Sequence, residues 1–170
     1  FEAVAESYGV DSNRTQQVLE MPYQRAKRAV SLHRSKLEGK RVHFLPDSQL
    51  EIPMARFLSE ECGLSVNEIG TPFHDQLVMR GELARLAQDV PMVEGQDLDP
   101  ALARVRAARP DLTVCGMGIA NALESEGLRT KWSIELVFSP VQGFDQAGDL
   151  AGLFAKPLAR EEILEVGSWS

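Results

Sequence analysis

The 170-residue sequence contains only two cysteines, Cys62 and Cys115, and it has no Cys-x-x-Cys pair. A structural zinc site and a complete iron–sulfur site each need several closely placed ligands, so neither can be built from this chain alone. We therefore predict no metal ligands in this chain. Both thiols are expected to be reduced residues of the hydrophobic core.

Long hydrophobic runs are also missing. No apolar stretch approaches the roughly 20 residues that a membrane-spanning helix needs, and no segment resembles a signal peptide. Hydrophobic residues make up 44% and charged residues 25% of the sequence, which is ordinary for a globular protein. The sequence predicts one domain, or one domain with an extra element, in a cytoplasmic protein without a membrane span.

Positive charge is scarce. The net charge is −7, and residues 1–41 hold eight basic against five acidic side chains, so the rest of the chain carries −10. The small positive excess lies on one predicted helix, where it is typical of a solvated helix face. This distribution argues against a nucleic-acid-binding surface.

Catalytic motifs are absent as well. The sequence has no Gly-x-Ser-x-Gly or His-Glu-x-x-His pattern, and His33, His43 and His74 are scattered. His33 lies on an apolar helix stripe, where we expect a packed or partly exposed side chain. Asp47 and Asp97 follow predicted strands, where a carboxylate acts as a proton donor or caps a helix; capping is favoured. No catalytic residue is assigned.

What the sequence does contain is an alternation of short apolar strands and amphipathic helices. Ser48 and Glu51 form a capping-box pattern that places a helix start after the first strand. Strands are predicted at 41–45, 64–69 and 112–115, and helices at 48–62, within 75–88 and at 99–108. This order predicts an α/β fold, a Rossmann-like open parallel sheet with flanking helices.

Further elements flank this unit. Leu19 to Leu37 form the apolar stripe of an amino-terminal helix, with Pro22 near its first turn. Residues 132–138 read as a strand or an apolar extended segment. A last helix places Ala147, Leu150, Ala151 and Phe154 on one face.

The segment LTVCGMGIANALESEGLRTKW resembles a dinucleotide-binding loop only in part. Gly116 and Gly118 fit the first two glycines of that fingerprint, but Asn121 occupies the third position. We interpret the segment as a turn that needs glycine backbone freedom at the carboxyl end of a strand. The predicted cleft then lies near residues 46–49 and 116–121.

Four motifs together resemble a known family. PDSQLEIP, EGQDL, CGMGIAN and TKWSIE are similar, in order and spacing, to the carboxyl-terminal third of subunit N in the light-independent protochlorophyllide reductase family, which is nitrogenase-like. The resemblance extends from Arg41 to Leu158. It implies a nitrogenase component 1-like domain, and it divides the chain into a helical connection from a preceding domain (residues 1–40) and a Rossmann-like carboxyl-terminal domain (residues 41–170).

The resemblance also implies an activity. Subunits N and B of the family form a heterotetramer, and subunit L hydrolyses ATP to deliver electrons to a [4Fe-4S] cluster between N and B. The ring D C17=C18 double bond of protochlorophyllide is then reduced to give chlorophyllide, in the bacterial cytoplasm or the plastid stroma. The family's cluster ligands lie outside this chain, so the chain alone is expected to be inactive.

Within this chain the resemblance points to a substrate-binding wall made by Trp132, Gly116 and Gly118. Trp132 aligns with a tryptophan of the family's apolar pigment pocket, although core packing is the alternative. Lys131 could meet a pigment propionate, but a solvated surface lysine is favoured. Two other functions stay open: another nitrogenase-like subunit, of chlorophyllide reductase or a nitrogenase cofactor scaffold, and a non-catalytic α/β ligand-binding module.

Overall fold

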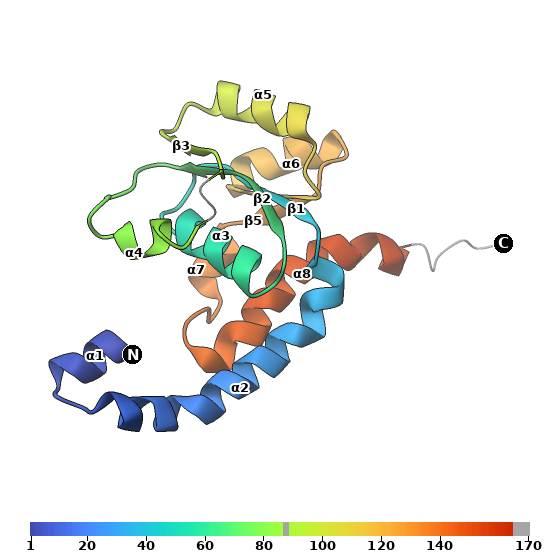
Figure 1. Ribbon diagram of the computed structural model, residues 1–170. Coiled ribbons are helices and arrows are strands. Elements are labelled where there is room, and N and C mark those ends of the chain that lie inside the picture. Colours follow the sequence, from blue (N-terminus) through green and yellow to red (C-terminus); the bar gives the residue numbers. More distant parts are fainter. Residues whose placement is uncertain (87–88, 165–170) are drawn as a thin grey trace.

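The computed structural model describes residues 1–86 and 89–164, and a parallel sheet lies at its centre (Figure 1). The sheet has five strands in the order β3-β2-β1-β4-β5, and every neighbouring pair is parallel. The predicted open parallel sheet is confirmed. The strands are β1 (Arg41–Phe44), β2 (Ser65–Thr71), β3 (Met92–Glu94), β4 (Leu112–Cys115) and β5 (Thr130–Trp132).

Helices cover both faces of the sheet (Figure 1). One face carries α3 (Glu51–Glu60) and α8 (Ala147–Leu164), and the long α2 (Ser12–Leu37) packs alongside α8. The other face carries α5 (Leu98–Ala108) and α6 (Met117–Ser125). The remaining helical elements are short: α1 (Glu2–Ser7), α4 (Arg80–Leu83), α7 (Ile134–Phe138) and the 3-10 turn η1 (Phe144–Gln146).

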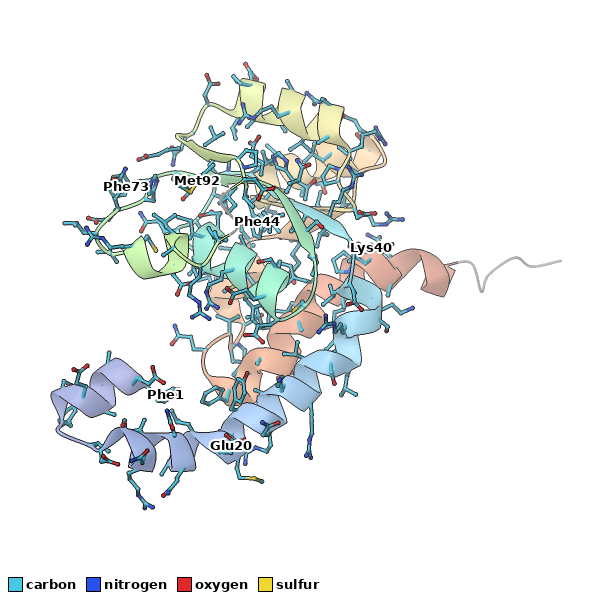
Figure 2. The ribbon with its side chains drawn as sticks, in the orientation of Figure 1. Phe1, Glu20, Lys40, Phe44, Phe73 and Met92 are labelled. Carbon is cyan, nitrogen blue, oxygen red and sulfur yellow. The ribbon has the colours of Figure 1, made fainter. Side chains whose placement is uncertain are left out.

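Apolar side chains on the two faces form two separate cores. Val42 and Phe44 of β1 pack with α3 and α8, and Figure 2 shows Phe44 within the body of the domain. Cys115, at the end of β4, packs on the other face with Val105 of α5 and Leu123 of α6. Helices cover both faces, as is typical of parallel sheets, but polar residues such as His43 and Glu68 also lie within the strands.

The amino-terminal helix is longer than predicted. Asp11 caps α2 by accepting hydrogen bonds from the backbone N–H groups of Asn13 and Arg14, so the helix begins at Ser12. Pro22 therefore lies inside the helix rather than in its first turn. The prediction took proline as a start signal, whereas the stronger Asp11 cap sets the start. Whether residues 1–40 connect to a preceding domain stays a prediction.

The predicted apolar face of the last helix is confirmed, since Leu150, Ala151 and Phe154 of α8 are buried in the α2/α8 side of the core. Small residues allow α2 and α8 to approach closely. A Cβ added at Gly152 would lie 3.2 Å from the ring of His33. His33 is partly buried against α8, as its place on the apolar stripe predicts.

The predicted strand or extended segment at 132–138 is wrong beyond its first residue. Strand β5 ends at Trp132, and after Ser133 the residues Ile134–Phe138 form α7. The chain leaves the sheet at Ser133, whose backbone N–H donates to the Cys115 carbonyl of β4 at 3.0 Å and whose side chain is also bonded. The apolar run predicts a strand or an extended segment, but it forms a helix with an exposed apolar side.

The helix predicted within 75–88 is reduced to α4, which has four residues, and residues 87–88 lie outside the described part of the chain. Asp75 accepts hydrogen bonds from the N–H groups of Leu77 and Val78 and forms a turn before α4. Gly81 in the middle of α4 disfavours a longer helix. The short apolar piece that follows supplies the edge strand β3.

A polar network lies in the sheet beneath α5. His43 of β1 is fully buried, with its Nδ1 atom 3.0 Å from the Asn67 side-chain amide and its Nε2 atom 3.5 Å from a Glu68 oxygen. Arg104 of α5 donates from Nε to both Glu68 oxygens, at 2.9 and 2.8 Å. Burial lowers the pKa of His43, Glu68 opposes this and Arg104 reinforces it, so the imidazole is held neutral.

The buried His43 predicts acid sensitivity. As pH falls below about 6.5, the unfolded chain takes up a proton that the folded state resists, so the free energy of unfolding should fall by up to about 1.4 kcal/mol per pH unit. His43→Gln cannot take up this proton and should flatten that part of the profile. Urea unfolding of both proteins from about pH 8 to about pH 5 measures the difference. Identical pH profiles for the two proteins would contradict the prediction.

Candidate functional site

The strand order places the topological switch point of the sheet between β1 and β4. The connection after β1 leads to α3 on one face, and the connection after β4 leads to α6 on the other face. Where successive connections diverge in this way, open α/β sheets bind their ligands at the carboxyl ends of the strands. The two loops predicted to border the cleft, 46–49 and 116–121, begin at this point.

Gly116 and Gly118 have different structural roles. Gly116 caps α6 with φ −65° and ψ 148°, so it needs no left-handed backbone. The predicted need for glycine backbone freedom is therefore wrong, and space is the reason: a Cβ at Gly116 would lie 2.5 Å from Asp47 Oδ1. Gly118 lies in the first turn of α6 and faces open space.

Asp47 links the two loops to the start of α7. The Ser133 hydroxyl donates to an Asp47 carboxylate oxygen, and it also lies 3.2 Å from the Cys115 carbonyl. Asp47 is therefore not the helix cap that was predicted. Asp97 does occupy the N-cap position of α5, but its side chain makes no capping hydrogen bond there. The geometry gives Asp47 the role of a structural link between β1, β4 and α7.

The predicted capping box is only half formed, because α3 begins at Glu51 rather than at Ser48, with Leu50 at its N-cap and no side-chain cap there. The Ser48 hydroxyl accepts from the Leu50 backbone N–H at 3.1 Å, while the Glu51 carboxylate ties β1 to β2. Glu51 accepts hydrogen bonds from the Ser48 backbone N–H at 2.6 Å and from the Ser48 hydroxyl at 3.0 Å. Its second oxygen accepts from the Thr71 hydroxyl at the end of β2, at 3.2 Å. Burial raises the pKa of Glu51, while its hydrogen bonds with Ser48 work in the opposite direction. The loop after β1 is thus held from both sides.

Trp132 lies at the carboxyl end of β5, next to Cys115 of β4 in the strand register. Its partly buried side chain packs against the core beneath α5 and α6, and it also borders an open groove beside β5. The structure therefore combines the two alternatives, core packing and a place at a cavity wall. It brings Trp132 and Gly116 to the same edge of the sheet, and their role in ligand binding stays a prediction.

Lys131 differs from the prediction of a solvated surface lysine. Its side chain is 4% exposed, and its ammonium group donates to Glu135 in the first turn of α7. This ion pair joins β5 to α7 between residues four positions apart. It forms because a buried ammonium group needs a carboxylate partner. Neither Ser133 nor Glu135 was identified from the sequence, because their partners depend on the β5-to-α7 turn.

Large apolar side chains are exposed along the carboxyl edge of the sheet. The α7 apolar surface, which we define as Ile134, Val137 and Phe138, is the clearest case, with Val137 63% and Phe138 83% exposed. Others follow β2 and β4: Phe73, Leu77, Val78 and Met117. Figure 2 shows Phe73 at the periphery of the domain. Exposed apolar side chains gathered in one region mark a surface that binds an apolar ligand or another protein.

The cysteines do not form a cluster-binding site. Cys62 lies in the core beneath α2, α3 and α8, and Cys115 lies in the separate core beneath α5 and α6. Burial raises the pKa of each thiol to about 12, so both are protonated and poor metal ligands. Among the described residues no group of three or more His, Cys, Asp or Glu side chains is placed to hold a metal ion. An iron–sulfur cluster does not fit these residues.

The two glycines provide a matched test of the site geometry. Gly116→Ala should displace Asp47 from Ser133 and lower the free energy of unfolding by about 1–3 kcal/mol. Gly118→Ala meets no neighbour and removes a glycine from a helix, so it should raise the free energy of unfolding by about 0.5 kcal/mol. Urea unfolding of both variants measures these changes. Equal shifts in the same direction would show that Asp47 does not confine Gly116.

The nitrogenase component 1 type oxidoreductase family matches residues 1–158, and the chain belongs to this family. The solved structure of nitrogenase Cp1 at pH 5 covers 94% of this chain, and 38% of its own chain is aligned, with a TM-score of 0.73 at 12% identity. At this identity the likeness shows the fold alone.

Much closer in sequence are light-independent protochlorophyllide reductase N subunits. That of Halorhodospira halophila is 58% identical over 165 residues, which is 97% of this chain and 39% of the relative. That of Acidiphilium rubrum is 54% identical, also over 97% of this chain. The resemblance stated from the sequence motifs is confirmed. The chain spans about two-fifths of the length of these relatives, and its position within them stays a prediction.

Proposed function

We propose that this chain is part of subunit N in a light-independent protochlorophyllide reductase and supplies one wall of the pigment site. The observation that carries the proposal is identity of 58% and 54% over almost the entire chain to relatives that bear this name. The aligned length includes the loops at residues 46–49 and 116–121, Trp132 and α7. The alternatives named from the sequence lack a comparable observation.

The exposed side chains support the pigment wall. A tetrapyrrole is large, flat and mostly apolar, and a site for it needs apolar and aromatic walls that exclude water. The α7 apolar surface follows Trp132 directly, and Gly116 and Gly118 begin α6 on the neighbouring strand. In the proposed complex, Trp132 and the α7 apolar surface contact the pigment, and the Asp47–Ser133 hydrogen bond positions α7.

The remaining components of the proposed complex lie outside this chain. Two N and two B subunits form a heterotetramer, and subunit L uses ATP to deliver electrons to a [4Fe-4S] cluster whose ligands come from elsewhere. The reaction adds two electrons and two protons across the ring D C17=C18 bond and gives chlorophyllide. We place the complex in the bacterial cytoplasm or the plastid stroma. No helix among the residues described here has the length and apolar character to cross a membrane.

A chimera tests this proposal. The aligned segment of the Halorhodospira halophila N subunit is replaced by this chain, and the chimera is purified with the B subunit. Subunit L, ATP, a reductant and protochlorophyllide are then added, and chlorophyllide is followed by absorbance. We expect chlorophyllide to form. An assembled chimera that retains its cluster but forms no product would contradict the proposal.

The isolated chain is the matched control for the chimera. Mixed with the B and L subunits under the same conditions, it should give no product, since its two thiols are buried in separate cores and bind no cluster. Product from the isolated chain would show that the cluster ligands are not missing from it. This control separates a contribution to the pigment wall from catalysis by the chain itself.

A further inference from the structure

A long groove runs beside β5, at the open edge of the sheet. Strand β5 is the last in the strand order and pairs with β4 on one side only. The groove has a volume of about 1000 Å³, and helices of both layers form its walls. We call it the edge groove. Its lining includes Glu124 of α6, Thr130 and Trp132 of β5, Glu135 of α7, and Lys156 and Arg160 of α8.

The backbone of β5 presents free hydrogen-bonding groups to the edge groove. The Arg129 carbonyl accepts from Thr113 of β4, and the Ser133 N–H donates to Cys115 of β4. In a parallel ladder successive residues point their N–H and C=O groups to opposite sides. The backbone groups of Thr130 and Trp132 therefore point away from β4 and into the groove. Unpaired strand edges of this kind pair readily with another extended chain.

Charged side chains are distributed unevenly between the two walls of the edge groove. Lys156 and Arg160 are exposed and one turn apart on α8, and among the described residues neither has a carboxylate partner. The two acidic side chains of the lining are already engaged, Glu124 by the Thr130 hydroxyl and Glu135 by Lys131. Lys156 and Arg160 therefore place positive charge on the α8 wall, while Glu124 places a carboxylate on the α6 wall.

We propose that the edge groove binds an extended segment of a partner chain, which adds to the sheet as a further strand beside β5. Side chains of a strand alternate between its two faces, so every second side chain would face α8. The charges of Lys156 and Arg160 select acidic residues at those positions. Neutral side chains fit the other face, near Glu124. This interaction goes beyond pigment reduction, although the edge groove shares Trp132 and the start of α7 with the proposed pigment wall.

A defined peptide tests the proposal. A fluorescein-labelled peptide that alternates valine and glutamate is titrated with the chain, and fluorescence anisotropy reports binding. We expect saturable binding, weakened at least about tenfold by Lys156→Glu with Arg160→Glu. Arg14→Glu with Arg28→Glu changes the net charge equally on exposed parts of α2 and should leave the affinity unchanged. Circular dichroism verifies that all variants are folded.

Backbone methylation separates strand pairing from simple charge attraction. Two versions of the peptide carry N-methyl groups on alternate residues, one on the valines and one on the glutamates. Only one version should lose binding, because a strand directs alternate N–H groups toward β5. Equal binding of both versions, or no binding of the unmodified peptide, would overturn the proposal. Equal binding of a valine–lysine peptide would overturn the assigned acidic chemistry.

Discussion

Replacing Val137 and Phe138 together with aspartate should lower chlorophyllide formation by the chimera by about 100-fold, because two carboxylates against an apolar ligand cost on the order of 3 kcal/mol. Both side chains are largely exposed, so the substitutions remove little packing within the chain. Their role is therefore expected to appear in ligand binding rather than in folding. Pigment affinity and turnover are both measured on the purified heterotetramer.

Met21→Asp with Leu32→Asp is the matched control. Both residues are exposed apolar side chains on α2, and the pair introduces the same charge. This control should retain turnover and an unchanged melting temperature. If the Val137/Phe138 variant keeps more than half of its activity, the α7 apolar surface is not part of the pigment wall. Loss of heterotetramer assembly would instead assign α7 to a subunit contact.

Gly148→Val should lower the free energy of unfolding by about 3 kcal/mol, because it forces the two longest helices apart. A Cβ at Gly148 would lie 2.6 Å from the Ala29 side chain and 3.3 Å from its carbonyl carbon. The neighbouring Ala29 atoms belong to its backbone and its methyl group. Unlike the end of a flexible side chain, these atoms cannot move aside. Urea unfolding measures the change. An unchanged midpoint would show that α8 does not pack closely against α2 at Gly148.

A double-mutant cycle identifies the cause of this destabilisation. Gly148→Ala alone should destabilise the chain, and Ala29→Gly should restore part of the lost stability when combined with it, since the two changes share one contact. The combined effect must then be smaller than the sum of the single effects. Strict additivity would mean that the loss arises from helix propensity and not from the α2–α8 contact.

The regular part of the fold follows from the sequence. Strand β4 matches its predicted bounds, because an apolar run between a helix end and a glycine leaves few other structures. The hydrogen bond from the Ser48 backbone N–H to Glu51 was recognisable because both groups lie within four consecutive residues, although α3 begins at Glu51 and not at Ser48. Local patterns of this kind need no knowledge of the rest of the chain.

The features that were missed all depend on contacts between distant segments. Lys131 is buried because the chain turns at Ser133 and brings Glu135 back over it, and no local pattern specifies that turn. The reason for glycine at position 116 is Asp47, which lies on another loop. The exposed apolar side chains of α7 look like core residues in sequence, so their position on the surface could not be read from composition.

The pairing of α2 with α8 sets the order in which the chain can fold during synthesis. Most of the chain lies between the two helices, so α2 leaves the ribosome on the order of 10 seconds before α8 at ordinary translation rates. Through this interval Val30 and Leu37 lack the helix that covers them in the finished domain. The nascent chain therefore presents an apolar helix stripe to chaperones until its last helix has been made.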